Sequence, residues 1–254
     1  MHVVPLPALA DNYIWLLHDD AGQAIVVDPG DAGPVEAALS GRALQLRAIL
    51  LTHHHGDHVA GAAALRERHG ATVYGPRDER IGAVDRRVGQ GDVVSLDRPR
   101  ARFEVIDVPG HTRSHIAYAG EGLLFCGDTL FSLGCGRLFE GTPAQMLASL
   151  ERLAALPGDL KVCCGHEYTQ ANGRFAREVD PANPALAARC EEAAEARAHG
   201  RPTLPVPLAS ELACNPFLRI DSEPLTDWAS RGHAGGSRVE RFAALRAAKD
   251  AFQG

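Results

Sequence analysis

The feature that most limits what this chain can fold into is an apolar run that ends in a cluster of histidines. Residues 49–58 read Ile-Leu-Leu-Thr-His-His-His-Gly-Asp-His. The mostly apolar residues 47–51 predict a buried strand, and the Ala- and Leu-rich residues 59–69 predict a helix after it. The cluster therefore lies on a strand-to-helix loop, where rigid elements hold several metal ligands at fixed angles and leave them open to substrate.

The spacing H-x-H-x-D-H formed by His53, His55, Asp57 and His58 indicates a metal site. If the start of the loop is extended, His53 and His55 share one face, because side chains two apart point the same way. Asp57 and His58 lie where the helix begins and are displaced from that pair. A single catalytic zinc takes about three protein ligands and a water molecule. The pattern therefore favours two adjacent ions over one ion, and over a histidine-rich surface turn.

The composition is that of an ordinary soluble globular protein, with 45% hydrophobic and 23% charged residues among 254. The net charge of -6 argues against nucleic acid as a partner. No apolar stretch approaches the length of a membrane span, and residues 1–17 lack the pattern of a signal peptide. We therefore expect a cytoplasmic protein, a monomer, that binds neither nucleic acid nor a membrane.

The cysteines follow neither a disulfide framework nor the spacing of a zinc knuckle. Two of them each precede a candidate ligand by two residues, so a metal role is an alternative, but small buried core residues at strand ends are favoured. We expect most of them to be reduced and buried. The six positions are Cys126, Cys135, Cys163, Cys164, Cys190 and Cys214, of which Cys126 and Cys164 are those two.

Strand and helix signals alternate along the first two thirds of the chain, and helical spacing dominates after residue 167. Strands are expected at residues 12–18, 24–28, 71–74, 93–96, 101–108, 115–119, 123–126 and 161–164. One helix is expected to end near residue 41, and a second helix is expected to span residues 142–156. We expect a main α/β (α+β) domain at residues 1–169 and a small helical domain at 170–254, which a proline-rich linker interrupts at 201–207.

Metal-type residues also follow three later apolar runs, each beside a glycine. Taken singly, each is more typical of a structural histidine or aspartate. Taken with the first cluster, they bring seven ligand-type residues to four strand ends, which indicates a metal centre. The three motifs are Gly110-His111-Thr112, Gly127-Asp128-Thr129 and Gly165-His166-Glu167.

These motifs resemble the metallo-β-lactamase superfamily, and within it the glyoxalase II, or hydroxyacylglutathione hydrolase, family. The metal-type motifs are specific only to the superfamily, whereas Cys-Asn-Pro-Phe-Leu-Arg at 214–219 and Arg-Ala-Ala-Lys-Asp at 246–250 narrow the match. The resemblance extends over nearly the whole chain and includes residues 10–13, 134–137 and 140–142. It implies an αββα metallo-β-lactamase sandwich followed by a small helical domain that binds glutathione.

The resemblance also divides the ligands between two metal ions. It implies that His53, His55 and His111 hold the first ion, that Asp57, His58 and His166 hold the second, and that Asp128 bridges them. A carboxylate suits the bridge because it alone among these side chains offers two oxygens to two cations. Zinc is the expected metal, and iron or manganese are alternatives for the same ligands.

The resemblance implies hydrolysis of the thioester S-D-lactoylglutathione to D-lactate and glutathione, a step of methylglyoxal detoxification. A hydroxide on the metals is the expected nucleophile, with Asp57 and Asp128 as catalytic residues. The matching glutathione contacts are Arg137, Tyr168, Arg246 and Lys249. Two positions depart from the family pattern: the family often has Lys at Arg137 and Tyr at Phe139, so one hydroxyl donor to glutathione is missing.

Two other functions share part of this pattern. A glutathione persulfide dioxygenase of the same superfamily uses a single iron, but residues 138–142 and the long helical tail favour the hydrolase. A zinc-stabilised binding module without activity would not place so many ligands on loops around an open site. Of the remaining histidines, His54 is expected to face solvent or support a ligand, and His115 is expected to be a core or hydrogen-bonding residue.

Overall fold

Two units make up the described part of this computed structural model, which comprises residues 1–233 and 236–253. Unit 1 contains Met1–Asp107, Ser114–Gly127 and Cys163–His166. Unit 2 contains Val108–Arg113, Asp128–Val162 and Glu167–Gly254. The domain boundary expected near residue 170 stays a prediction.

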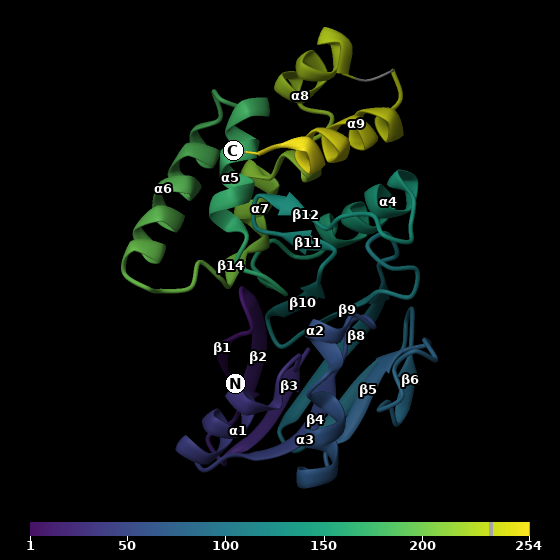
Figure 1. Cartoon of the computed structure of the whole chain (residues 1–254), viewed down its shortest axis with the longest axis vertical. Coiled ribbons are helices and arrows are strands. Elements are labelled where there is room, and N and C mark those ends of the chain that lie inside the picture. Colours follow the sequence, from purple (N-terminus) through teal and green to yellow (C-terminus); the bar gives the residue numbers. More distant parts are fainter. Residues whose placement is uncertain (234–235, 254) are drawn as a thin grey trace. The chain divides into compact units, whose positions relative to one another are not determined.

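The first sheet of unit 1 runs in the order β1-β2-β3-β4-β5-β6 (Figure 1). Its strands are β1 (His2–Ala8), β2 (Asn12–His18), β3 (Gln23–Val27), β4 (Gln45–Leu50), β5 (Thr72–Pro76) and β6 (Arg86–Val88). The first three pair antiparallel, and β3 to β6 pair parallel. Parallel strands need a crossover, which α1 (Ala32–Gly41) supplies between β3 and β4, and α2 (Gly56–Val59) with α3 (Ala62–His69) between β4 and β5.

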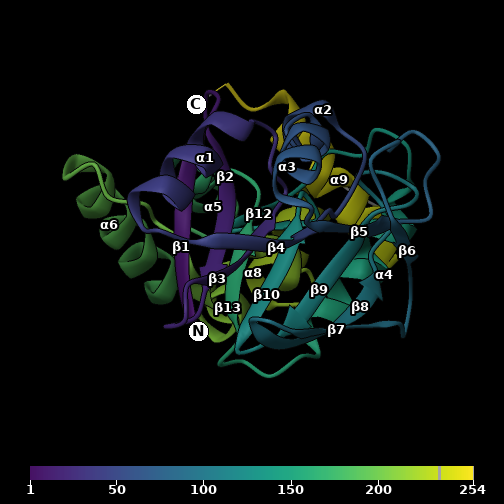
Figure 2. The same ribbon diagram turned by 90° about the horizontal axis from the view of Figure 1, so that it is seen from below.

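The central strands of this sheet are covered on both faces. Ile14 and Leu16 of β2 pack in one core with Val35 of α1. Trp15 points to the opposite face, where its Nε1 donates to Cys164 O of the second sheet at 3.0 Å. Figure 2 accordingly shows α1 and α3 on one side of the first sheet and β8 to β10 on the other. This double cover explains why the strands are almost continuously apolar.

In the second sheet, whose order includes β13-β10-β9-β8-β7, unit 1 contains β7 to β10 and the last two residues of β13. Its strands are β7 (Val93–Asp97), β8 (Arg100–Asp107), β9 (Ile116–Gly120), β10 (Leu123–Gly127) and β13 (Lys161–Cys164). The strands β7 to β10 form an antiparallel meander. Tyr118 Oη of β9 donates to Leu51 O at 3.0 Å, which joins this sheet to the end of β4. The loops that leave β4, β10 and β13 carry candidate ligands.

Unit 2 is mainly helical, with α5 packed against α6 and α4 against α9 (Figure 1). Capping boxes begin α4 at Thr142 and α9 at Ser237. Among the described residues, no helix is long and apolar enough to cross a membrane. The elements are β11 (Leu130–Phe131), β12 (Gly134–Cys135), α4 (Pro143–Ala154), α5 (Thr169–Val179), α6 (Pro184–Ala198), β14 (Val206–Pro207), α7 (Leu208–Cys214), η1 (Pro216–Leu218), α8 (Glu223–Trp228), η2 (Ala229–His233) and α9 (Arg238–Ala251).

The strands and helices predicted from the sequence are confirmed within a few residues, but several elements were not predicted. β1 carries Pro5 and Pro7, which argue against a strand and are tolerated here because β1 is an edge. β6, β11, β12 and β14 are too short to show a period. The helix predicted at residues 59–69 is wrong at its start, because α2 ends at Val59 and α3 begins only at Ala62. Gly61 lies between the two helices, where the backbone of α1 passes so close that a Cβ would lie 2.6 Å from Ala32 N.

Candidate metal centre and cationic cluster

The histidine cluster lies on the loop between β4 and α2, as the sequence predicts. β4 ends at Leu50, and α2 begins at Gly56 with His55 as its N-cap residue. The end of β13 brings a further predicted ligand into the same unit. The predicted ligands in unit 1 are His53, His55, Asp57, His58 and His166.

Three ligand-type atoms of unit 1 form an equilateral triangle. His58 Nε2, His166 Nε2 and Asp57 Oδ2 lie 3.4 Å from one another on every side. Bonds of about 2.0–2.2 Å to a tetrahedral metal place its ligand atoms about 3.3–3.6 Å apart. The triangle therefore has the dimensions of one face of a tetrahedral site, and two imidazoles with a carboxylate suit a divalent ion.

The far nitrogen of each imidazole in this triangle faces a carboxylate. His58 Nδ1 lies 3.1 Å from Asp28 Oδ2, and His166 Nδ1 lies 2.7 Å from Asp11 Oδ1. A carboxylate at Nδ1 keeps the proton there and leaves the lone pair on Nε2 for a metal. Sequence reasoning missed both carboxylates as functional residues. The signals available were the Ala10-to-Tyr13 motif for Asp11 and the strand end for Asp28.

Asp57 is held in its ionised form by the two histidines of the triangle and by Asn12. The His166 and His58 side chains hold the pKa of Asp57 well below its usual range, and Asn12 Nδ2 donates to Asp57 Oδ2 at 2.9 Å. Asp57 Oδ1 makes no hydrogen bond to any residue of the described ranges. The side chain is 39% exposed. One oxygen is therefore fixed and the other is open to solvent or substrate.

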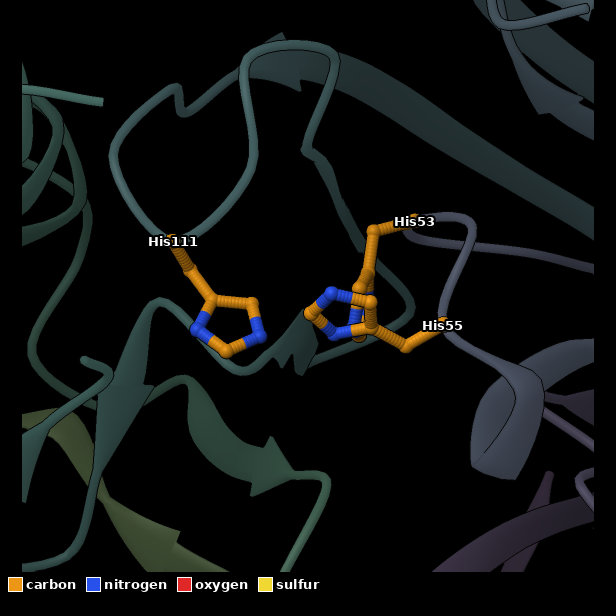
Figure 3. A group of neighbouring side chains, drawn as sticks. All are labelled: His53, His55 and His111. Atoms are coloured by element: carbon orange, nitrogen blue, oxygen red, sulfur yellow. The ribbon is translucent and has the colours of Figure 1, made fainter. Parts of the chain in front are cut away.

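His53 and His55 form a second pair in unit 1. His53 Nε2 lies 3.1 Å from His55 Nδ1, and Figure 3 shows both side chains leaving the loop in the same direction. The prediction that they share a face is confirmed. His53 is fully buried, and its Nδ1 lies 3.0 Å from Thr52 Oγ1. The hydroxyl and the buried position fix the ring, so Nε2 is the atom that points towards His55.

Asp28, His53 and His58 are also close enough to hold an ion. The carboxylate of Asp28 already accepts from Thr52 N at 2.8 Å and from Thr52 Oγ1 at 2.6 Å, and it faces His58 Nδ1. Because three polar atoms already surround its two oxygens, Asp28 supports the ligands rather than binding a metal itself.

The other two predicted ligands belong to unit 2 and lie beside each other there. His111, also labelled in Figure 3, follows β8, and its Nε2 lies 3.5 Å from Asp128 Oδ2. His111 Nδ1 lies 2.9 Å from Arg137 O, which leaves Nε2 as the metal-facing nitrogen. Unit 2 thus repeats the arrangement of unit 1, with an imidazole oriented by an oxygen and placed next to a carboxylate.

The two histidines expected to lie outside the ligand set have supporting places in unit 1. His115 is buried, with Nδ1 3.1 Å from Ile116 O, and its ring stacks on that of His53 at 4.6 Å. His54 is partly buried, with Nδ1 3.6 Å from Asp78 Oδ2. Arg80 donates to Asp78 and holds the pKa of this carboxyl well below its usual range. His115 is the hydrogen-bonding core residue that was predicted.

Unit 2 also carries a cationic cluster, defined by Arg137, Arg174, Arg246 and Lys249. Burial lowers the pKa of Lys249, and so do the charges of Arg246, Arg174 and Arg137, in that order. Lys249 Nζ contacts Ala171 O at 3.5 Å, one helical turn before Arg174 on α5. Within the described ranges, Asp250 is the carboxylate that pairs with this cluster, through Arg137 and Arg246. The cluster therefore carries a surplus of positive charge that suits an anion.

Arg246 differs from the other cations of the cluster because it is buried. It is 5% exposed; its Nη1 donates to Cys135 O at 2.6 Å, and its Nη2 donates to Asp250 Oδ1 at 3.0 Å. The guanidinium also lies 5.2 Å from the centre of the Phe217 ring. These contacts give Arg246 a structural role in unit 2, and a contact with substrate stays a prediction.

Two aromatic residues named by the sequence also lie in unit 2. The half-buried Tyr168 packs its ring edge-on against Phe131 at 5.2 Å. Phe139 is 64% exposed, and its ring lies 5.2 Å from that of His111. An exposed aromatic beside a candidate ligand is available for substrate, although it has no hydroxyl to donate.

Comparisons with known proteins agree with this architecture. The pattern of the metallo-β-lactamase superfamily matches residues 10–166, and that of the hydroxyacylglutathione hydrolase C-terminus matches residues 167–252. Hydroxyacylglutathione hydrolases of Xanthomonas campestris pv. campestris (strain B100) and Stenotrophomonas maltophilia (strain R551-3) are 53% and 54% identical, over 100% of both chains in each case. The crystal structure of ETHE1 from Myxococcus xanthus aligns with a TM-score of 0.60 and 32% identity, over 86% of this chain and 99% of that one.

The predicted fold class is confirmed by these matches, since the two sheets with their helices and the C-terminal helical part agree with the metallo-β-lactamase fold. More than half of the residues are identical to those of hydroxyacylglutathione hydrolases over the full length, which narrows the assignment from the superfamily to this family. The chain belongs to the hydroxyacylglutathione hydrolase family of the metallo-β-lactamase superfamily.

Proposed function

We propose that this chain hydrolyses glutathione thioesters, S-D-lactoylglutathione first, to a hydroxy acid and glutathione, as a step of methylglyoxal detoxification. The observation that carries the proposal is the 3.4 Å triangle of His58, His166 and Asp57, with carboxylates behind both imidazoles. The full-length identity to hydroxyacylglutathione hydrolases supports this substrate class. The absence of disulfides among the six cysteines, all within the described ranges, supports a reducing, cytoplasmic location.

We further propose that two divalent ions occupy the centre. His53, His55 and His111 would hold the first, Asp57, His58 and His166 the second, and Asp128 both. Zinc suits a mixture of imidazoles and carboxylates, and iron or manganese would accept the same ligands.

The metal ions, when bound, supply an activated water molecule at neutral pH and polarise the thioester carbonyl. The residues of the chain would position the reactants. Asn12 and the two histidines fix Asp57 Oδ2, and the other carboxylate oxygen would accept a hydrogen bond from the attacking water and so orient it. Because a thiolate is a good leaving group, the departing glutathione sulfur needs no general acid.

The cationic cluster would bind the glutathione part of the substrate. Glutathione is a flexible anion with little apolar surface, so charge-assisted hydrogen bonds must provide most of its affinity. Arg137, Lys249 and Arg246 supply the positive charge, Tyr168 supplies a hydroxyl, and the helical residues 170–254 would form the binding domain. Phe139 would line the site through its ring alone.

Metal analysis beside a hydrolysis assay tests the proposal. We expect two metal ions per chain and release of glutathione from S-D-lactoylglutathione. Asp128→Ala should lower the occupancy of both metal positions, whereas Asp159→Ala, an exposed carboxylate of the same unit, should not. Retention of two ions by Asp128→Ala would refute the bridge. Oxygen uptake with glutathione persulfide and one bound iron would instead identify a persulfide dioxygenase.

A further inference from the structure

The short hairpin β11–β12 of unit 2 is held by side chains from distant parts of the chain. Leu130 pairs with Cys135 and Phe131 with Gly134, so its own ladder offers few hydrogen bonds. Five more of its backbone groups bind side chains of α5, α7, α9 and the segment after α7. Residues far along the sequence therefore set the shape of this hairpin.

Glu211 of α7 makes the central contacts to the hairpin turn. It is fully buried and accepts from Ser132 Oγ at 2.7 Å and from Leu133 N at 2.8 Å. Leu133 has a φ of 60°, a left-handed conformation that is strained for a residue other than glycine. Such a conformation persists only where its surroundings enforce it, and the bond from Leu133 N to Glu211 does so here.

Two asparagines bind the carbonyl groups on either side of the turn. Asn215 Nδ2 donates to Phe131 O and to Gly134 O, both at 3.0 Å, and also to Glu211 Oε2 at 3.1 Å. Asn172 Nδ2 of α5 donates to Ser132 O at 3.1 Å. Both asparagines are buried. The Cys-Asn-Pro-Phe-Leu-Arg motif thereby gains a physical role in unit 2.

The hairpin lies between two residues to which the proposed function gives roles, Asp128 before it and Arg137 after it. Gly136 packs so closely on the start of the hairpin that a Cβ there would lie 1.9 Å from Asp128 O. Gly136 N also donates to Thr129 O at 3.2 Å. A change in the hairpin therefore moves the backbone of Asp128 directly, because no space separates the two segments.

We propose that Glu211, Asn215 and Asn172 are positioning residues: through the β11–β12 hairpin they place Asp128 for the metal centre and Arg137 for the substrate. The inference rests on the proposed function for the roles of Asp128 and Arg137. None of the three side chains touches a reacting atom. They act by fixing the backbone of Phe131, Ser132, Leu133 and Gly134.

Glu211→Ala is the main test, with Asp180→Ala as its matched control. Asp180 is an equally buried carboxylate of unit 2, but it contacts Asn183 and Arg219 instead of the hairpin. The readouts are hydrogen–deuterium exchange of the peptide covering residues 129–137 and metal content per folded chain. Glu211→Ala removes three hydrogen bonds, and the loss of even one bond to a charged group changes an opening equilibrium about tenfold to a hundredfold. Exchange in this peptide should accelerate by at least that factor in Glu211→Ala only.

Glu211→Gln is the conservative variant and should restore most of the protection. Its amide oxygen can accept from Leu133 N and Asn215 Nδ2, while its NH₂ group faces Ser132 Oγ, which can rotate to accept. If Glu211→Ala does not fold, Asn172→Ala removes a single bond to Ser132 O and should give the same local signature more weakly.

Unchanged exchange at residues 129–137, or a loss of metal equal to that in Asp180→Ala, would overturn the inference. Asp128→Ala distinguishes this failure from failure of the proposed function. If Asp128→Ala loses metal and Glu211→Ala does not, the positioning role is refuted and the metal assignment stands. If Asp128→Ala keeps both ions, the metal assignment itself is refuted.

Discussion

The candidate ligands of unit 1 and the cationic cluster of unit 2 are held in opposite ways. In unit 1, His58 and His166 each have a carboxylate behind the ring, and their facing nitrogens converge to 3.4 Å. In unit 2, positive groups are gathered with Asp250 as the carboxylate that pairs with them in the described ranges. Unit 1 therefore fixes the positions of ligand atoms, whereas the cluster in unit 2 provides a surplus of positive charge.

The difference indicates what each region accepts. Convergent nitrogen and oxygen atoms at tetrahedral spacing suit a small divalent cation such as zinc, because the distances leave no room for a larger group. A set of cationic side chains from a loop and two helices suits a flexible anion, because its more exposed members can adjust to the anion while the surplus charge attracts it. Removing charge or ligands from each region separately therefore tests the two assignments independently.

Removal of metal should give the largest effect and acts on unit 1. Dialysis against a chelator should abolish hydrolysis, because the activated water is lost together with the ions. It should also lower the melting temperature, since a ligand that binds only the folded state stabilises it. Addition of zinc should restore both. Full activity in protein shown by elemental analysis to be metal-free would contradict the metal assignment of unit 1.

Asp28→Asn should have the next largest effect, although Asp28 lies outside the proposed ligand set. The amide would no longer provide a negative charge to His58 Nδ1, and loss of such an outer carboxylate costs about 10- to 100-fold in metal affinity or activity. The measurement is zinc affinity by competition with a chromophoric chelator. Asp31→Asn is the matched control, since Asp31 caps α1 through Gly33 N and an asparagine caps equally well. Equal affinities in the two variants would show that Asp28 does not support the centre.

The H-x-H-x-D-H cluster could be predicted because all its determinants are local. A strand period places His53 with His55, and the helix start displaces Asp57 and His58. The carboxylates behind the ligands could not be assigned, because Asp11 lies 155 residues from His166, and many aspartates in the chain precede a strand or a turn equally well. Outer contacts of this kind depend on tertiary structure alone.

Unit 2 could be predicted less well for the same reason. Helical spacing identified its helices, but the β11–β12 hairpin has strands of two residues, too short for a period, and Glu211 lies 78 residues from Leu133. The burial of Arg246 could not be predicted from the sequence either, because arginine is rarely buried unless it is paired. Its partners, Cys135 O and the ring of Phe217, become neighbours only in the folded unit.

Lys249→Met should have a moderate effect confined to unit 2. It keeps the aliphatic stem but removes the charge, so binding of glutathione should weaken equally in the ground and transition states. A hydrogen bond between charged groups contributes about 1.5–3 kcal/mol, so KM for lactoylglutathione should rise about tenfold to a hundredfold with little change in kcat. Steady-state kinetics on this substrate and on a short thioester without the glutathione peptide provide the measurement.

The controls for Lys249→Met lie on the same helix. Arg238→Met removes a cation that pairs with Asp221 and Glu151, and it should leave KM unchanged. Arg246→Met should raise KM and lower the melting temperature as well, because Cys135 O loses its donor inside unit 2. Equal losses with both substrates in Lys249→Met would mean that the lysine is structural and that the cationic cluster does not bind glutathione.

Alkylation of the thiols should have the smallest effect and tests both units together. Burial raises the pKa of Cys135 to about 11 and that of Cys214 to about 12, so both are protonated and unreactive at neutral pH.

Cys190 is half-buried and is the thiol we expect iodoacetamide to reach in the native protein. Mass spectrometry should find the label at Cys190 with hydrolysis unchanged, because water rather than a thiolate attacks the thioester. Labelling of Cys135 and Cys214 should appear only as the pH approaches their raised pKa values or after unfolding. Loss of hydrolysis in step with modification of Cys126 or Cys164, the cysteines two residues before Asp128 and His166, would show that a thiol takes part and would overturn the distinction drawn between the two units.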